Sequence, residues 1–406
     1  MTRNLSGPER SAIHIDILTG EANPYPFYKL WRMNNPVFQF EPDGLWAVCR
    51  YDDVKYALTN PGIFSSEANK DYFQTKWLDR RYWKDLGFLS MDPPEHTRYR
   101  RLISKDFAYE AVKLLVPFMK ETVRSLISNI PPHQETEFLG EFACPCAGNL
   151  IDHILGTENG LILKNLQTQP QLDNVHDLLK PDPRLIKEQE HAAQQEIDYL
   201  MSFIEKRRLK PEDDLISKLL SVELDGKKLT DTMICNIMSL FLLAGTNALS
   251  HLLCHMIIFL SRRPDIFQAL KKDSSEIPAF IEELLRFSSP APTVIRRTTE
   301  GVILSGVTIP KGKNVLLFIA SANRDPSIFP KPDEFDITRP NINKHLSFGF
   351  GPHKCLGAYL TRLKVRIILE CILDKFNGVT CPGDDQLDWN NSFMMNSVEK
   401  LPLSFF

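Results

Sequence analysis

The chain of 406 residues has little of what marks several large protein classes. Its net charge is only −3, its isoelectric point is 6.4, and neither basic nor acidic residues gather into a run, so nucleic-acid binding is a poor first hypothesis. Residues 1–10 contain neither the apolar core of a signal peptide nor a membrane anchor, and we expect a cytoplasmic protein. No internal repeat or low-complexity linker divides the sequence, which predicts one interleaved domain over residues 1–406 without a fused reductase domain.

The eight cysteines form no CxxC pair and are scattered through the chain. Several lie within apolar segments, which suits free thiols in a reducing compartment better than a disulfide framework. Cys144 and Cys146 are separated by one proline, a spacing too short for the usual zinc knuckle. We therefore expect these two to be buried, unreactive thiols.

Long uninterrupted apolar runs are also missing. The most apolar stretch, residues 234–260, contains polar side chains such as Asn236, Thr246 and His251. It therefore predicts a central buried helix rather than a membrane span, which needs about 20 predominantly apolar residues. Hydrophobic periodicity predicts helices over residues 95–108, 109–130, 189–208, 230–260 and 277–287, and short strands over residues 37–40, 45–49, 302–304 and 314–318. The expected fold class is mainly α, an α+β arrangement with small antiparallel sheets.

A bend near the C-terminus carries the strongest chemical signal, and it reads Phe348-Gly349-Phe350-Gly351-Pro352-His353-Lys354-Cys355-Leu356-Gly357. Glycines allow such a bend to turn tightly, and an amphipathic helical pattern follows it. Free N–H groups and the positive end of a helix favour an anion, so we predict that Cys355 opens the helix as a thiolate with a lowered pKa. Two roles stay open on these residues alone: a nucleophile with His353 as its base, or a metal ligand.

The same ten residues resemble, almost position for position, the haem-binding loop of the cytochrome P-450 family. Three glycines, the leading phenylalanine and the cysteine all fall at the family's spacing. The resemblance implies the P-450 fold with a long central helix over haem b, and Cys355 as the axial thiolate that binds the iron. It also implies that the loop around the haem includes Phe348, Gly349 and Gly357.

Other segments match the family's haem-carboxylate contacts. Residues 92–101 resemble its propionate-binding helix, which implies that His96 and Arg100 hold haem carboxylates. Arg296 and His353 match two further contacts, with Arg297 as the alternative to Arg296 by one register step. Cations and guanidinium forks suit a dianionic edge because charge-assisted hydrogen bonds are strong where water is excluded.

Glu283 and Arg286 lie three residues apart and resemble the family's ExxR pair. A helical acid–base pair at this spacing is common on surfaces and is weak evidence alone. The resemblance implies a third member downstream, for which Arg339 is the candidate. We expect this trio to lock the fold rather than to take part in catalysis.

The central helix departs from the family at the position over the haem. The usual sequence is Ala/Gly-Gly-x-acid-Thr, whereas this chain reads Ala244-Gly245-Thr246-Asn247-Ala248. The small Ala244 and Gly245 imply retained oxygen access, but Asn247 and Ala248 replace the acid and the hydroxyl that orient water for proton delivery.

Three interpretations of this departure follow. In the favoured one, a group of the substrate or an ordered water completes the proton relay. In the second, His251, one turn beyond Asn247, shuttles protons. In the third, the enzyme performs desaturation, oxidative coupling or peroxide-driven oxidation instead of hydroxylation.

Aromatic residues ahead of the His96 helix and residues just before Arg296 lie where the family binds its substrates. The predicted substrate contacts are Phe73, Trp77, Phe88, Pro292, Thr293 and Val294. The substrate class implied is a small, secondary-metabolite-like organic molecule, and attachment to a carrier protein is an open option.

The leading interpretation is a haem-thiolate monooxygenase that uses O2 to hydroxylate or epoxidise its substrate, and a haem-binding sensor is less favoured. Since no flavin or nicotinamide domain is present, electrons are expected from a ferredoxin and its reductase. The candidate cations of a docking face for this donor are Lys354, Arg362, Arg101 and Lys105.

Overall fold

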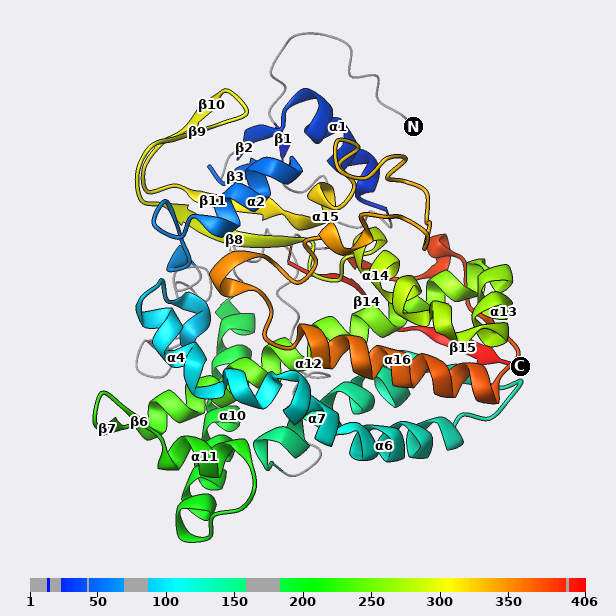
Figure 1. The fold of residues 1–406 in the computed structure, drawn as a ribbon, viewed down its shortest axis with the longest axis horizontal. Coiled ribbons are helices and arrows are strands. Elements are labelled where there is room, and N and C mark those ends of the chain that lie inside the picture. The colour runs from blue at the N-terminus through cyan, green and yellow to red at the C-terminus, as the bar shows by residue number, and fades with distance from the viewer. Residues whose placement is uncertain (1–12, 15–22, 42–43, 69–86, 158–182, 392–393) are drawn as a thin grey trace.

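The computed structural model describes residues 13–14, 23–41, 44–68, 87–157, 183–391 and 394–406 (Figure 1). Helices form the body of the molecule, and the strands gather mainly at the end that is uppermost in the view. The α-helices are α1 (Tyr25–Asn34), α2 (Tyr51–Thr59), α4 (Glu95–Ile103), α5 (Tyr109–Leu114), α6 (Val116–Ser128), α7 (Cys144–Leu155), α10 (Pro183–Leu209), α11 (Leu215–Ser221), α12 (Asp231–Arg262), α13 (Pro264–Lys272), α14 (Ile277–Phe287), α15 (Ile319–Ala322) and α16 (Ala358–Lys375).

The largest sheet joins strands from the first 65 residues with two strands from residues 293–318, in the order β1-β2-β3-β11-β8-β4. Its β3 and β11 are parallel, whereas β11 and β8 are antiparallel with Val315 opposite Arg296. The smaller sheets are β9-β10, β12-β15-β5, β13-β14 and β6-β7. The strands are β1 (Ile13–His14), β2 (Val37–Glu41), β3 (Trp46–Val48), β4 (Phe64–Ser65), β5 (Glu135–Glu137), β6 (Glu223–Leu224), β7 (Lys227–Lys228), β8 (Thr293–Thr298), β9 (Val302–Leu304), β10 (Val307–Ile309), β11 (Asn314–Phe318), β12 (Val379–Thr380), β13 (Trp389–Asn391), β14 (Asn396–Val398) and β15 (Pro402–Phe405).

Helix α12 runs through the helical body and packs against α7 (Figure 1). Thr230 caps its start by accepting a hydrogen bond from the Met233 N–H at 3.2 Å. The helix is apolar on most of its circumference, which is the pattern of a core helix. By length and composition it could cross a membrane, but 72% of its most apolar window is buried inside the fold. The predicted central buried helix is therefore confirmed.

Proline decides several boundaries that the periodicity misplaced. The predicted helix over residues 109–130 is divided into α5 and α6, because Pro117 fits only the first turn of a new helix. Helix α10 begins at Pro183, earlier than predicted, for the same reason. The helix expected over residues 95–108 becomes α4 followed by a 3₁₀ turn, Ser104–Phe107.

Candidate functional site

The loop before α16 is held in its bend by its own backbone. The Cys355 N–H donates to the Phe348 carbonyl at 2.7 Å, and the Gly349 N–H donates to the Leu346 carbonyl at 2.7 Å. Gly349 and Gly351 have φ values of +65° and +71°, which L-residues rarely adopt. A Cβ on Gly351 would lie 2.5 Å from the Leu58 carbonyl oxygen at the end of α2. Glycine at this position therefore lets the loop close against α2.

Cys355 lies just before α16 rather than in its first turn, since the helix begins at Ala358 with Gly357 as its N-cap. The structure does not show the predicted lowering of its pKa: although the residue is exposed, desolvation of the sulfur raises the pKa of the thiol above its usual value. The Gly357 N–H and the charges of Arg100, Arg362 and Lys354 oppose that rise. Cys355 is the residue that would hold a metal cation here, and such a cation would favour the thiolate form of its sulfur.

Phe348 is fixed by a neighbouring ion pair. The Arg362 guanidinium stacks over the Phe348 ring at 4.4 Å and forms hydrogen bonds of 2.5 and 2.8 Å with Glu282. Although burial raises the pKa of Glu282, hydrogen bonds from Arg362 and His345 outweigh it and bring that pKa to about 2. Arg362 therefore supports the loop, and its place on the docking face stays a prediction.

Four cationic or ionisable side chains from three distant segments meet beside this loop. His96 and Arg100 come from α4, Arg296 from β8 and His353 from the loop itself. The His96 and His353 rings are 4.0 Å apart, and Arg100 donates to the Lys354 carbonyl at 2.5 Å. The structure thus brings together all four residues predicted to hold carboxylates.

The register of β8 decides between the two adjacent arginines. Successive side chains on a strand point to opposite faces. Arg296 is buried, and its guanidinium donates to the Ile295 carbonyl at 2.7 Å, whereas Arg297 is partly exposed and donates to Asn314 at 3.1 Å. Burial lowers the pKa of Arg296 to about 10. Arg296 is thus the member of the pair that faces His96 and His353.

The cluster combines two guanidinium groups with two imidazole rings. Both ring nitrogens of His96, and Nε2 of His353, lack a hydrogen-bond partner in the part of the chain described. Burial, Arg100 and Arg296 lower the pKa of His96 to about 4, and burial, Arg296, His96 and Arg100 lower that of His353 to about 2. Buried donors normally find acceptors, so this arrangement suits a dianionic ligand bound next to Cys355. An iron porphyrin with two carboxylates has that chemistry.

The predicted folding lock is confirmed in full. Glu283 accepts two hydrogen bonds of 2.7 Å from Arg286 and one of 3.0 Å from Arg339, and all three residues are buried. The Asp336 N–H adds a fourth bond to Glu283 at 2.8 Å. The remaining guanidinium hydrogens of Arg286 go to the carbonyls of Asn323, Pro332 and Glu334. The lock joins α14 to the segment that leads into the Cys355 loop.

One face of α12 retains accessible surface although most of the helix is buried. Ala244 is exposed and Asn247 and Ala248 are half-buried. Two hydroxyls lie close by in sequence, but both are engaged with backbone. Thr246 donates to the Leu242 carbonyl at 2.5 Å, and Ser250 donates to the Thr246 carbonyl at 3.0 Å. The accessible face therefore presents the Leu243 side chain, an amide and two methyl groups, with neither hydroxyl directed at it.

Comparisons with known proteins agree with this geometry. A family model described as cytochrome P450 matches residues 23–403. The chain belongs to the cytochrome P450 family. Cytochrome P450 109 of Bacillus spizizenii is 33% identical over 94% of this chain and 91% of its own length. Cyclomarin C epoxidase CymV of Salinispora arenicola is 32% identical over 90% of this chain and 92% of its own. P450BioI, solved in complex with an acyl carrier protein ligated to hexadec-9Z-enoic acid, is 28% identical with a TM-score of 0.83 over 95% of this chain and 99% of its own.

Membership of the cytochrome P450 family settles several expectations. The chain is a haem-thiolate oxidoreductase of the monooxygenase class, and family members bind haem b through a cysteine thiolate. The mainly helical P450 fold is confirmed. The hydrolase interpretation of Cys355 and His353 is wrong, because it leaves the cation cluster and the Glu283 lock without a purpose.

Gly245 of this P450 does not lie where the sequence placed it. We expected it to open a groove over the cofactor, but a Cβ at Gly245 would lie 2.4 Å from Cδ1 of Ile151. Its bare side therefore faces α7. Of the two small residues, Ala244 is the more exposed.

His251 is buried one turn beyond Asn247, and its Nδ1 has no partner among the residues described. Burial and the nearby His255 lower the pKa of His251 to about 3. A proton shuttle needs a pKa near the working pH, so this value argues against His251 in that role.

The predicted substrate contacts of this P450 fall into three groups. Phe88 is buried with its ring 6.0 Å from His96, which makes it a packing partner of the cation cluster. Val294 shares the Arg296 face of β8, whereas Thr293 lies on the other face and is buried. Pro292 is buried and accepts the Ala320 N–H at 3.0 Å. The third group, Phe73 and Trp77, lies outside the described residues.

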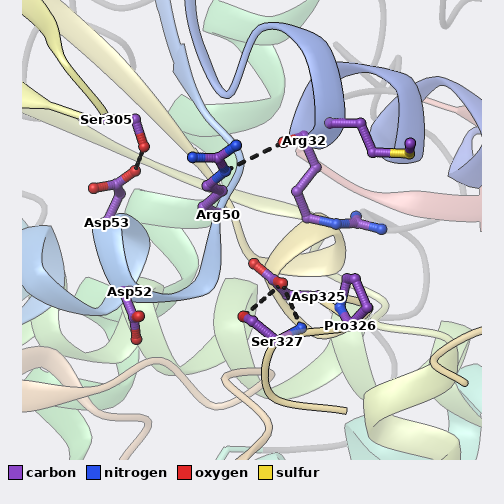
Figure 2. A pocket seen from close by; sticks show the side chains of 9 residues that line it. Arg32, Arg50, Asp52, Asp53, Ser305, Asp325, Pro326 and Ser327 are labelled. Carbon is purple, nitrogen blue, oxygen red and sulfur yellow. Dashed lines mark hydrogen bonds between the residues drawn. The ribbon is translucent and has the colours of Figure 1, made fainter. Parts of the chain in front are cut away.

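A pocket of about 690 Å³ elsewhere on this P450 belongs to a different region (Figure 2). Asp53, at the start of α2, accepts from Ser305 in the β9–β10 turn, and the Arg50 side chain donates to the Arg32 carbonyl at 3.3 Å. Asp325 is held by Ser327 at 2.7 Å and by the Tyr51 N–H. The pocket lies at the start of α2, whereas the Cys355 loop packs against its other end, so the two sites are separate.

Two residues that the sequence did not single out belong to the site of this P450. Asp92 accepts hydrogen bonds of 2.5 Å from Ser65 and 2.7 Å from the Ser66 N–H, and its charge raises the pKa of Arg296 against the effect of burial. Leu243 is 37% exposed in the middle of α12 and shares a face with Asn247. Leu243 precedes Asn247 by four residues, about one helical turn, and this spacing could have identified it from the sequence.

Proposed function

We propose that this P450 binds haem b through the Cys355 thiolate and oxidises a small organic substrate with proton delivery completed by the substrate or by water. When bound, haem b supplies the iron centre at which molecular oxygen is activated. The chain's part in holding it falls to His96, Arg100, Arg296 and His353 for the two carboxylates. The buried ring nitrogens of His96 and His353 that lack hydrogen-bond partners among the described residues, and the buried Arg296 guanidinium beside them, support that assignment.

The single observation that carries the proposal is the engagement of both α12 hydroxyls with backbone carbonyls. Thr246 at 2.5 Å from the Leu242 oxygen and Ser250 at 3.0 Å from the Thr246 oxygen have their protons committed within the helix. Ala248 has no titratable group, and burial keeps His251 neutral near pH 7. The protons consumed in the reaction must then reach the site through groups that the helix does not provide.

Asn247 has a defined place in this scheme. Its amide is half-buried on the accessible face and can both donate and accept a hydrogen bond. An amide cannot change its protonation near neutral pH, so its role is to orient a water molecule or a polar substrate group. A substrate that brings its own hydroxyl or amide would complete the hydrogen-bond path.

The test introduces the missing hydroxyl and its isosteric control, Ala248→Thr and Ala248→Val. The probe is the compound with the largest shift of the haem absorption spectrum in a substrate screen, together with an analogue that lacks its hydroxyl or amide. We expect the wild type to couple electrons to product well with the full compound and poorly with the analogue. Ala248→Thr should raise the coupled fraction only for the analogue, and Ala248→Val for neither. Product and hydrogen peroxide are measured per electron pair consumed.

The proposal is wrong if the wild type releases most electrons as peroxide even with the full compound and Ala248→Thr, but not Ala248→Val, corrects this. Product identification in the same assay decides between hydroxylation or epoxidation and the alternative of desaturation or oxidative coupling. Asn247 and Ala248 are the residues that keep this alternative open.

The substrate class we propose is a secondary-metabolite-like molecule, either free or attached to a carrier protein. A relative is named for the epoxidation of cyclomarin C, and another was solved with an acyl carrier protein. Leu243 and Val294 add apolar surface next to Asn247 and Arg296, which suits a mainly apolar ligand with few polar groups.

We further propose a ferredoxin, served by its reductase in the cytoplasm, as the electron donor. Lys354, Arg101 and Lys105 are exposed beside the Cys355 loop and α4. Tyr109 and Leu114 of α5 expose apolar surface, 55% and 80% respectively, next in the chain to these cations. An apolar centre with a basic rim is a surface that an acidic protein partner can dock on.

A further inference from the structure

The contact between α12 and α7 is closest at Gly245. A Cβ built there would lie 2.4 Å from Cδ1 and 2.8 Å from Cγ1 of Ile151, far inside the 3.5–4.0 Å at which carbon atoms pack. Ile151 is buried in α7, and a β-branched side chain in a helix is stiff at χ1. The two helices can therefore approach this closely only because residue 245 has no side chain.

The face of α12 that Gly245 supports is the one with Asn247. In an α-helix two residues correspond to a turn of about 200°, so Asn247 lies nearly opposite Gly245. Any push from α7 at Gly245 moves the helix toward the side of Asn247 and of Leu243, which precedes Asn247 by one turn. The proposed function places Asn247 over the iron.

Helix α7 is fixed on several sides and cannot yield easily. Lys364 of α16 donates to the Cys146 carbonyl in its first turn. At its other end the Gly156 carbonyl accepts from Arg207 of α10 at 2.8 Å, and a Cβ at Gly156 would collide with Asp214. The space between α7 and α12 is therefore set by anchors outside α12.

We propose that the Gly245–Ile151 contact is a positioning device that sets how closely the Asn247 side of α12 approaches the iron-bound ligand. The proposal rests on the proposed function, since it assumes a haem beneath that face. Gly245 acts through α12 as a whole and touches neither substrate nor cofactor. The height of the space over the iron is then decided by the size of the residue on the far side of the helix.

The experiment measures binding of two iron ligands of different bulk, phenylimidazole and cyanide, to the loaded protein by absorption spectroscopy. Gly245→Ala should shift α12 toward the iron and weaken phenylimidazole by about tenfold or more, with cyanide changed by less than about threefold. Ile151→Val deletes the atom at 2.4 Å, and Ile151→Ala also deletes the one at 2.8 Å. In the Gly245→Ala background the first should restore part of the phenylimidazole affinity and the second nearly all of it.

Gly301→Ala is the matched control, because its added methyl would have nothing closer than the Ile309 carbonyl oxygen at 4.0 Å. The inference is overturned if Gly245→Ala leaves the ratio of the two affinities unchanged, or if truncating Ile151 fails to restore it. A loss of both ligands to the same degree would mean general loss of haem or of fold, and would also overturn it. The proposed function fails in a different way, namely if the wild type binds neither ligand at a thiolate-ligated iron.

Discussion

Two buried clusters of charge in this P450 contrast in how their charges are balanced. In the lock, Glu283 receives hydrogen bonds from Arg286 and Arg339, and backbone carbonyls take up the remaining guanidinium hydrogens. In the cation cluster, Arg296 is also buried, but its guanidinium donates to the Ile295 carbonyl and has only the nearby charge of Asp92 to oppose the effect of burial, and His96 has no hydrogen-bond partner among the described residues. One cluster is complete within the chain and the other is built around something that the chain does not supply.

The contrast separates residues that hold the fold from residues that wait for a ligand. Burying a charge is costly unless it is paired, so an unpaired cation in a folded protein implies either a cost or a partner from outside. The lock already has its partner, and its removal should damage the chain with or without haem. The cation cluster should matter mainly when haem carboxylates are present.

The largest effect is expected from breaking the lock with Glu283→Gln. This change leaves two buried guanidinium groups without their carboxylate and should cost about 3–5 kcal/mol of unfolding free energy. Glu282→Gln, at the next position of α14, is the matched control. Glu282 pairs with the more exposed Arg362, so its loss should cost roughly 1–2 kcal/mol. Chemical unfolding followed by circular dichroism measures both, and equal destabilisation would contradict the special role of Glu283.

The second effect distinguishes Arg296 from Arg297 in the same strand. Arg296→Gln should speed the transfer of haem to apomyoglobin by about tenfold or more, because a buried charge-assisted bond to a carboxylate is lost. Arg297→Gln should change that rate by less than about threefold.

In the haem-free protein, the same variant should not be harmful. There Arg296→Gln removes a buried cation and should leave stability unchanged or raise it, which calorimetry of the haem-free chain measures. If Arg296→Gln destabilises the loaded and the haem-free protein alike, Arg296 belongs to the fold and the contrast between the clusters does not hold.

The sequence predicted the parts of the site that depend on short local patterns. The Cys355 loop and the Glu283–Arg286 step are each read within a few residues, and Arg339 could be placed from its neighbouring motif. Strand β8 was missed because Arg296 and Arg297 stand side by side and hide the alternation that marks a half-buried strand. Pairing with β11 on one side and β4 on the other fixes this strand, and neither neighbour can be read from local periodicity.

Burial and distant contacts account for the errors. The pKa of Cys355 was given the wrong direction because the desolvation around its sulfur depends on segments far away in the chain. Gly245 was assigned to the cofactor side because its partner, Ile151, cannot be inferred from the sequence of α12. Local spacing predicts which chemistry is present, whereas the direction in which each side chain faces depends on packing.

Lys364 allows the comparison to be extended to a third buried charge. It lies in α16, where it is buried and its ammonium donates to the Cys146 carbonyl. Burial lowers the pKa of Lys364 from 10.5 to about 8, so it is balanced less well than the lock.

The pH dependence of stability tests this intermediate case with the smallest expected effect. Between pH 8 and the ordinary lysine pKa the unfolded chain binds more protons at this position than the folded one, so the Lys364 contribution to stability rises with pH. Lys364→Met removes that contribution, and the stability of the wild type relative to the variant should increase by about 1–3 kcal/mol from pH 7 to pH 10. The measured quantity is how the difference in stability between wild type and variant changes with pH. Other groups that titrate between pH 7 and pH 10 contribute equally to both proteins, and the packing effect of the methionine does not depend on pH, so both cancel. Urea unfolding of both proteins at each pH gives the values, and a difference that stays flat would show that Lys364 is charged at no cost, like the arginines of the lock.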